Sequence, residues 1–184
     1  KGTYKKFTAN QQISLFKDGD EGVMNLENQL FLHDHFRNFS KDELSAQLFY
    51  PEGKIPKLET FKALGYPEKD AKRWIELFNH PTDLMKKARE ASQVKEDEAF
   101  DLISQYYDDV GYVENHVTRR WERPEQYLDW EGKKLGNNPV FLKNRKFVTR
   151  ADGMEAGFKP VSMDIRDEIR AMDRMRVNTL SRIH

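Results

Sequence analysis

The chain has 184 residues with 31 basic and 31 acidic side chains, and it contains no cysteine. The lack of cysteine excludes disulfides, thiolate metal sites and cysteine nucleophiles, and the zero net charge argues against a globally basic nucleic-acid-binding protein. The length fits one domain, or one and a half, and hydrophobic residues at 38% with charged residues at 34% predict an apolar core under a well-solvated surface. We expect no membrane span and see no secretion signal, because no apolar run approaches the ~18 residues that a span needs.

The N-terminal part of the chain is expected to be an arm followed by a buried helix. Residues 1–20 carry scattered apolar anchors, whereas residues 20–39 carry a wide set of apolar positions that is typical of a central helix. His33 and His35 flank Asp34 in this helix. Because residues two apart on a helix point about 200° away from each other, we expect no shared metal site.

Capping and turn residues predict the following helices. Ser40 and Glu43 have the spacing of a capping box, so a short helix is expected to follow and to end before Pro51. Gly65 suits a helix C-terminus, and Thr82 suits an N-cap. Apolar periodicity then places helices at residues 58–64, 67–78, 83–92, 96–109 and 165–183.

The segment 110–160 has a different character, with interleaved basic and aromatic residues. Between Gly132 and Ala151 there is no acidic residue, but there are six basic ones: Lys133, Lys134, Lys143, Arg145, Lys146 and Arg150. Frequent glycines and prolines exclude one long helix, while the large rings argue against disorder. We expect an extended segment with anchored rings and outward basic groups. Its β content should be at most a ribbon of residues 113–118 and 146–149.

Together these patterns predict a mainly α fold, an irregular multi-helix bundle with a long loop-rich segment before the last helix. The expected parts are an N-terminal arm (1–20), a helical domain (21–109), the irregular segment packed on it (110–160) and a C-terminal helix (161–184). The chain lacks an initiator methionine and ends within the last predicted helix. We therefore expect it to be part of a larger protein.

Two stretches of the C-terminal half, 111–130 and 141–165, resemble a family of very large proteins. The residues that carry the resemblance are Glu114, Asn115, His116, Arg145, Lys146, Phe147, Thr149, Gly157, Lys159 and Pro160. They resemble a pattern in the large polyvalent proteins of phages and mobile elements, which include DarB-like antirestriction proteins and virion proteins ejected with the genome. The resemblance implies a non-enzymatic module that is located in a virion or in the host cytoplasm.

Three functions follow as hypotheses. The first is a structural or interaction domain of a phage or mobile-element protein, whose partners are other protein chains or the rest of its own longer chain. The second is a nucleic-acid-binding module with DNA as partner, in which basic groups neutralise phosphates and exposed rings stack on bases. The residues expected to contact a partner or nucleic acid are Arg119, Arg120, Trp121, Lys133, Lys134, Lys143, Arg145, Lys146 and Arg150.

The third hypothesis is a hydrolase centred on His116. His116 could transfer a proton near neutral pH, Glu114 lies two residues before it, and Arg119 or Arg120 could hold an anion. An alternative is that Glu114 pairs with one of these arginines and simply holds the strand. Since no catalytic constellation stands out, we assign no catalytic, cofactor-binding or metal-binding residue.

Overall fold

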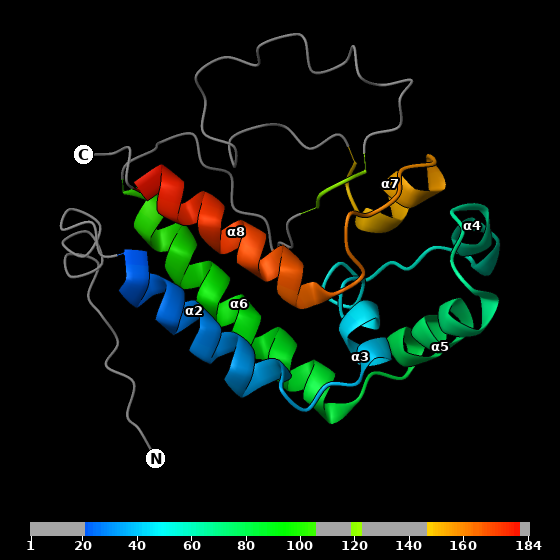
Figure 1. Cartoon of the computed structure of the whole chain (residues 1–184), viewed down its shortest axis with the longest axis horizontal. Coiled ribbons are helices and arrows are strands. Elements are labelled where there is room, and N and C mark those ends of the chain that lie inside the picture. The colour runs from blue at the N-terminus through cyan, green and yellow to red at the C-terminus, as the bar shows by residue number, and fades with distance from the viewer. Residues whose placement is uncertain (1–20, 106–118, 123–146, 181–184) are drawn as a thin grey trace, which may run out of the picture.

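The computed structural model describes residues 21–105, 119–122 and 147–180, and most of these residues are helical (Figure 1). The predicted mainly α fold is confirmed, since 65% of the described residues are helical and 2% are strand-like. The helices are α2 (Glu21–Phe36), α3 (Lys41–Ala46), α4 (Leu58–Ala63), α5 (Glu68–Asn79), α6 (Asp83–Ser104), α7 (Arg150–Glu155) and α8 (Ile165–Leu180). The expected N-terminal arm lies outside the described residues.

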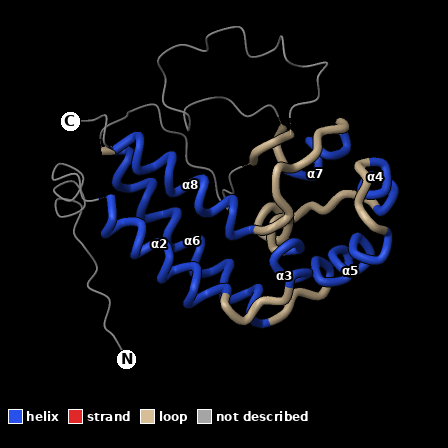
Figure 2. The backbone as a smooth tube through the Cα atoms, viewed as in Figure 1, coloured by secondary structure: helices blue, strands red, loops and turns tan. Residues whose placement is uncertain are grey.

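The three long helices α2, α6 and α8 run alongside one another, and the short helices lie at one end of them (Figure 1). Helix α2 packs against both α6 and α8. Helix α5 packs against α3 and α4, while α3 contacts α8 and α4 contacts α7. Loops join the short helices (Figure 2). The fold also brings together helices that are far apart in sequence, since α4 contacts α7.

The apolar core lies where the short helices meet the long ones. Phe61 of α4 is fully buried, and its ring makes edge contacts with Phe49, Tyr66 and Trp74 at centroid distances of 5.8, 6.0 and 5.4 Å. Edge-to-face aromatic pairs add to the free energy gained by burying the rings. The ring cluster therefore fixes α4 and α5 against the turn that follows α3.

Helix α6 corrects the prediction of two helices at 83–92 and 96–109, because Asp83–Ser104 form one continuous helix. The sequence between Asp83 and Ser104 contains neither glycine nor proline, so nothing in the backbone chemistry ends the helix. The interval between the two predicted helices contains Lys95, which reaches α2 and α8. Tertiary contacts thus stabilise this part of the helix.

Lys95 is the centre of a polar network between the long helices. Its Nζ donates to Asp173 Oδ2 of α8 at 2.8 Å and to Asn28 Oδ1 of α2 at 3.0 Å. Burial lowers the pKa of Lys95, while the attraction of Asp173 opposes this shift. Arg176 of α8 also pairs with Glu96 of α6. Such buried pairs fix the register of packed helices more than they add net stability.

The irregular segment 110–160 is partly helical, and residues 147–149 do not form the ribbon that was given as the upper limit of the β content. Thr149 is instead the N-cap of α7, and its hydroxyl accepts a hydrogen bond from the Asp152 N–H. Phe147 and Val148 are not strand residues, and residues 113–118 and 146 lie outside the described part. The β pairing seen among the described residues is an isolated antiparallel bridge between Trp121 and Pro160.

The capping box at the start of α3 is confirmed and supplies a first testable prediction. Glu43 N–H donates to Ser40 Oγ at 3.2 Å, and Ser40 N–H donates to Glu43 Oε2 at 2.7 Å. Replacing Ser40 by alanine should lower the free energy of unfolding by about 1 kcal/mol, because one N–H at the helix start loses its acceptor. Ser40→Gly should cost only a few tenths of that amount in urea unfolding. Equal losses for both variants would contradict a capping role.

Within the described ranges, no helix combines the length and the apolar character that crossing a bilayer requires.

Candidate functional site

The residues Arg119–Glu122, called here the docked segment, pair with the chain that precedes α8. Glu122 N–H donates to the Lys159 carbonyl at 2.8 Å, and Val161 N–H donates to the Arg120 carbonyl at 3.0 Å. Trp121 and Pro160 face each other between these two hydrogen bonds. Since proline has no N–H, Pro160 suits this non-hydrogen-bonded position. The docked segment is therefore held through its main chain as well as through its side chains.

Arg119 joins three parts of the chain that are distant in sequence. Its Nε donates to Glu52 Oε1 at 2.7 Å, and its two Nη atoms donate to the carbonyls of Phe147 and Val148 at 2.8 and 2.7 Å. The side chains of Arg119 and Glu52 are only 9% and 3% exposed. A planar guanidinium suits three fixed acceptors, whereas a lysine could not reproduce this fork.

A second arginine, Arg120, binds a buried glutamate on α8. Its Nε and Nη2 lie 3.2 and 3.1 Å from Glu168 Oε1, and Nη2 also donates to the Asp167 carbonyl at 3.4 Å. The Glu168 side chain is fully buried. Burial raises the pKa of Glu168, and the positive charges of Arg150 and Arg120 oppose this shift.

Arg150 lies fully buried between the two glutamates. Its backbone N–H donates to Glu52 Oε2 at 2.5 Å. Burial lowers the pKa of the Arg150 guanidinium, and the charges of Glu52 and Glu168 favour its protonated form. We call the five residues Glu52, Arg119, Arg120, Arg150 and Glu168 the arginine clamp. The clamp neutralises charges that would otherwise be costly to bury, and it fastens the docked segment to α7 and α8.

Trp121 completes the attachment with an aromatic cluster. Its ring makes edge contacts with Phe147 and Phe158 at centroid distances of 5.9 and 6.0 Å, and Phe147 and Phe158 lie 5.1 Å apart. A Cβ atom placed on Gly153 of α7 would overlap the Cζ2 and Cη2 atoms of Trp121. The ring thus occupies the space that the missing side chain of Gly153 leaves on the surface of α7.

The residues predicted to contact a partner differ in where they lie in the structure. Arg119, Arg120 and Trp121 come together in the docked segment, where they bind the protein's own helices. The expectation that the basic groups point outward is wrong for Arg150, which is 0% exposed. The other five predicted contacts lie outside the described residues: Lys133, Lys134, Lys143, Arg145 and Lys146.

The structure does not support the anion-binding role that the hydrolase hypothesis gives to Arg119 or Arg120. Arg119 and Arg120 are engaged by Glu52 and Glu168, so their guanidinium groups already bind carboxylates of the same chain. His116 and Glu114 lie outside the described residues. The proton-transfer role of His116 stays a prediction.

Sequence reasoning missed both glutamates of the arginine clamp. Glu52 follows Pro51 in a turn, and nothing in its local sequence marks it as a partner for residues beyond position 118. Glu168 could have been noticed, because it lies between Ile165 and Ile169 on the apolar face of the last helix. A charged residue on such a face usually has a buried partner of opposite charge.

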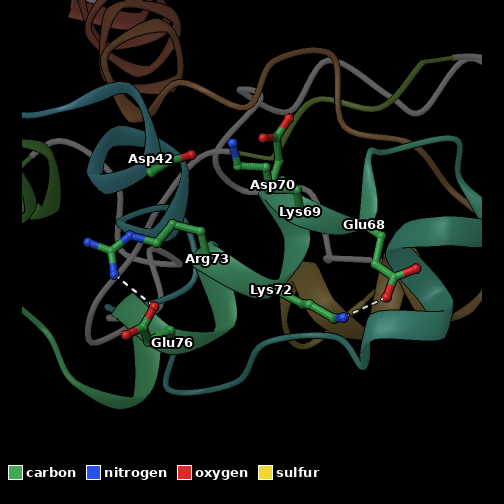
Figure 3. A pocket seen from close by; sticks show the side chains of 7 residues that line it. All are labelled: Asp42, Glu68, Lys69, Asp70, Lys72, Arg73 and Glu76. Atoms are coloured by element: carbon green, nitrogen blue, oxygen red, sulfur yellow. Dashed lines mark hydrogen bonds and ion pairs between the residues drawn. The ribbon is translucent and has the colours of Figure 1, made fainter.

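Helix α5 borders a shallow, charged surface depression (Figure 3). Residues of its lining form ion pairs with each other: Arg73 binds Glu76 at 2.7 Å, and Lys72 binds Glu68 at 2.7 Å. The depression is lined by Asp42, Glu68, Lys69, Asp70, Lys72, Arg73 and Glu76. These mixed and exposed charges favour a solvated surface.

The two histidines of α2 have different surroundings. His33 Nδ1 lies 3.4 Å from Asp34 on the surface, while the ring of His35 packs at 4.7 Å from the ring of Phe31. Over the described part of the chain, no group of three histidine, aspartate or glutamate side chains is placed to hold a metal ion.

Comparisons with protein families, curated proteins and solved structures found no match for this chain. The resemblance to large polyvalent proteins therefore stays a prediction.

Asp152 of α7 provides a prediction that depends on pH. Its carboxylate binds Lys54 Nζ at 2.5 Å and accepts from the Thr149 N–H at 2.9 Å, and these contacts lower its pKa from 3.8 to about 2. A lowered folded-state pKa stabilises the fold above the ordinary pKa, and the stabilisation disappears as pH falls from about 4 to about 2. Asp152→Asn should therefore lower the free energy of unfolding by at most about 1 kcal/mol near neutral pH, since the pair is partly exposed.

Urea unfolding at several pH values checks this prediction. The difference between the natural chain and Asp152→Asn should shrink below about pH 4 and vanish near pH 2. Asp70→Asn on α5 is a control outside α7. A loss for Asp152→Asn that stays constant down to pH 2 would show that charge is not responsible.

Proposed function

We propose that this chain is a structural and interaction domain of a larger phage or mobile-element protein, and that its helices hold the stretch 123–146 ready for a partner. The observation that supports this most is the double attachment of Arg119. It binds Glu52 of the helical body and the carbonyls of Phe147 and Val148. The two flanks of the stretch, Trp121 and Phe147, are thereby fastened side by side.

Fastened flanks favour partner binding for an energetic reason. The 123–146 stretch is rich in rings and cations in the sequence, with Tyr127, Trp130 and Phe141 among six basic residues. Aromatic residues dominate the binding energy of many protein interfaces. A segment whose two ends are already held loses less conformational entropy on binding than one with free ends. The arginine clamp provides this restraint in the folded protein. The conformational entropy of holding the two ends is therefore lost during folding and not on binding.

Site-specific photo-crosslinking in the source cells tests the proposal. A photoreactive residue at Tyr127 should give a discrete cross-linked product with one partner chain, whereas the same residue at the exposed Val94 of α6 should not. Mass spectrometry of the product should also place these 184 residues within a longer polypeptide. A free product of this length in the source, with no cross-link at Tyr127, would contradict the proposal.

A second candidate is nucleic-acid binding, which the acid-free run between Gly132 and Ala151 favours. Fluorescence titration with single-stranded DNA at two salt concentrations tests it. If the five basic residues of 133–146 each neutralise one phosphate, the logarithm of the binding constant should fall against the logarithm of salt with a slope of about −3.5. Replacing Lys133 and Lys134 by glutamine should make the slope shallower.

The matched control replaces Lys86 and Lys87, two exposed lysines of α6, by glutamine. This control should leave the slope unchanged, because these residues lie outside the basic run. Absence of binding at low salt, or binding that does not respond to salt, would contradict the electrostatic mechanism.

A further inference from the structure

We propose that the surface beneath the docked segment is a peptide-binding site for an extended Arg-Arg-aromatic sequence, and that its occupant in assemblies is the Arg119–Glu122 segment of a second copy of this chain. The surface consists of Glu52, Phe147, Gly153, Phe158, Lys159 and Glu168. Every residue in this proposal lies in the described part of the chain. It uses the same Arg119 contacts as the proposed function, and the peptide experiment below tests it without residues 124–146.

The surface recognises the first two residues of the segment by charge and by shape. Arg119 meets a carboxylate of Glu52 and two carbonyls, so three of its nitrogens have fixed acceptors. Arg120 places Nε and Nη2 on Glu168. Because each pocket of acceptors is negative and geometrically fixed, it favours arginine over lysine and over neutral side chains.

The third residue and the main chain add two further kinds of recognition. The ring of Trp121 lies against Gly153, Phe147 and Phe158, in a space that no side chain of α7 fills. The main chain pairs with residues 159 and 161 as an added strand would. Peptide-binding sites of the strand-addition type combine these features, since main-chain hydrogen bonds give affinity and side-chain pockets give specificity.

The surface is built by parts of the chain other than the segment it holds. Its two glutamates are 67 and 48 positions away from the arginines that they bind. Helix α7 is placed by its packing on α4, and α8 by its packing on α2 and α3. An equivalent segment from another molecule would therefore meet the same acceptors and the same rings.

A second copy is the occupant that best fits these contacts, because it carries an identical segment. Exchange of identical elements between copies is a low-cost route to a dimer. Within one chain the segment has an effective concentration in the millimolar range, so dilute protein keeps its own segment bound. Copies held close together, as in an assembly, would exchange segments.

The first experiment adds the segment as a separate molecule. The full chain carrying Arg119→Ala and Trp121→Ala retains the surface but lacks the anchors. A blocked peptide of residues 118–123 should raise the thermal midpoint of this variant by about 3–5 °C at ten times its Kd. The matched peptide with alanine at positions 119 and 121 should have no effect. If the variant has lost its helical far-UV circular dichroism, Arg119→Lys combined with Trp121→Ala replaces it as the host, because the lysine keeps a positive charge beside Glu52 but cannot bind all three acceptors, and the same peptides are compared.

The second experiment supplies the segment from another copy. The anchor-deficient variant is mixed with a Glu52→Gln chain, which has an intact segment but a weakened surface of its own. Light scattering after gel filtration should show a 1:1 complex in the mixture and monomers of each chain alone. Lack of a peptide effect on a folded host would overturn the peptide site. Peptide binding without the mixed complex would overturn the second copy as its occupant.

Discussion

Replacing Glu52 by glutamine should lower the free energy of unfolding by about 3–5 kcal/mol, the range measured when one partner of a buried ion pair is removed. The two oxygens of Glu52 accept from Arg119 Nε and from the Arg150 backbone N–H. An amide would turn an NH₂ group towards one of these donors. The variant would also remove a negative charge beside the buried guanidinium of Arg150.

Thermal unfolding followed by circular dichroism checks this prediction. A loss of this size corresponds to a fall of roughly 10 °C in the midpoint for a chain of this length. The matched control is Glu59→Gln, an exposed carboxylate on α4, which should shift the midpoint by no more than about 1–2 °C. Equal shifts for the two variants would mean that the arginine clamp contributes little to folding.

Local chemistry explains why the helical body could be predicted from the sequence. The capping box of Ser40 and Glu43 and the left-handed Gly65 (φ 86°) both act within a few residues, so the sequence alone locates the ends that they set. The apolar positions Ile165, Ile169 and Met172 recur at helical spacing, and all three are buried in α8. Short-range patterns of this kind determine where helices begin, end and face the core.

The errors arise where distant residues decide the outcome. Apolar periodicity predicts two helices where α6 is continuous, and Lys95, in the interval between them, binds partners on α2 and α8. Residues 146–149 are one of the two places where the sequence allows a β ribbon, whereas Thr149 is the N-cap of α7 with an extended backbone, a conformation that suits either structure. In each case the local sequence permits two structures, and a contact made elsewhere in the fold selects one.

The candidate site was only half predictable for a related reason. Arg119, Arg120 and Trp121 attract notice because charged and aromatic residues adjoin in an irregular segment. Their partners Glu52 and Glu168 belong to parts of the chain that have no sequence relation to that segment. The composition of the basic run also suggested an exposed Arg150, whereas two buried glutamates allow its charge to be enclosed. Burial of a charge thus depends on pairs that a single-sequence pattern does not reveal.

Gly153→Ala should destabilise the fold by about 2–3 kcal/mol, although alanine normally favours a helix by up to about 1 kcal/mol over glycine. Gly153 lies inside α7, where helix propensity alone predicts a gain. A Cβ atom at this position would overlap two ring atoms of Trp121 and would lie 3.0 Å from Phe147 Cδ2. The steric cost of placing a methyl group against these two rings is expected to outweigh the gain in helix propensity.

Removal of the Trp121 ring should reverse the sign of this effect. In a Trp121→Ala chain the two closest contacts of the added methyl group are gone, and the Phe147 ring can shift into the vacated space, so Gly153→Ala should leave the stability unchanged or raise it by up to about 1 kcal/mol. Urea unfolding of the two single variants and the double variant gives the coupling between positions 121 and 153. A coupling of several kcal/mol would support the placement of the ring on α7 in solution, because residues in contact couple whereas distant, independent residues give additive effects. Additive effects would mean that the docked segment does not occupy the surface of α7.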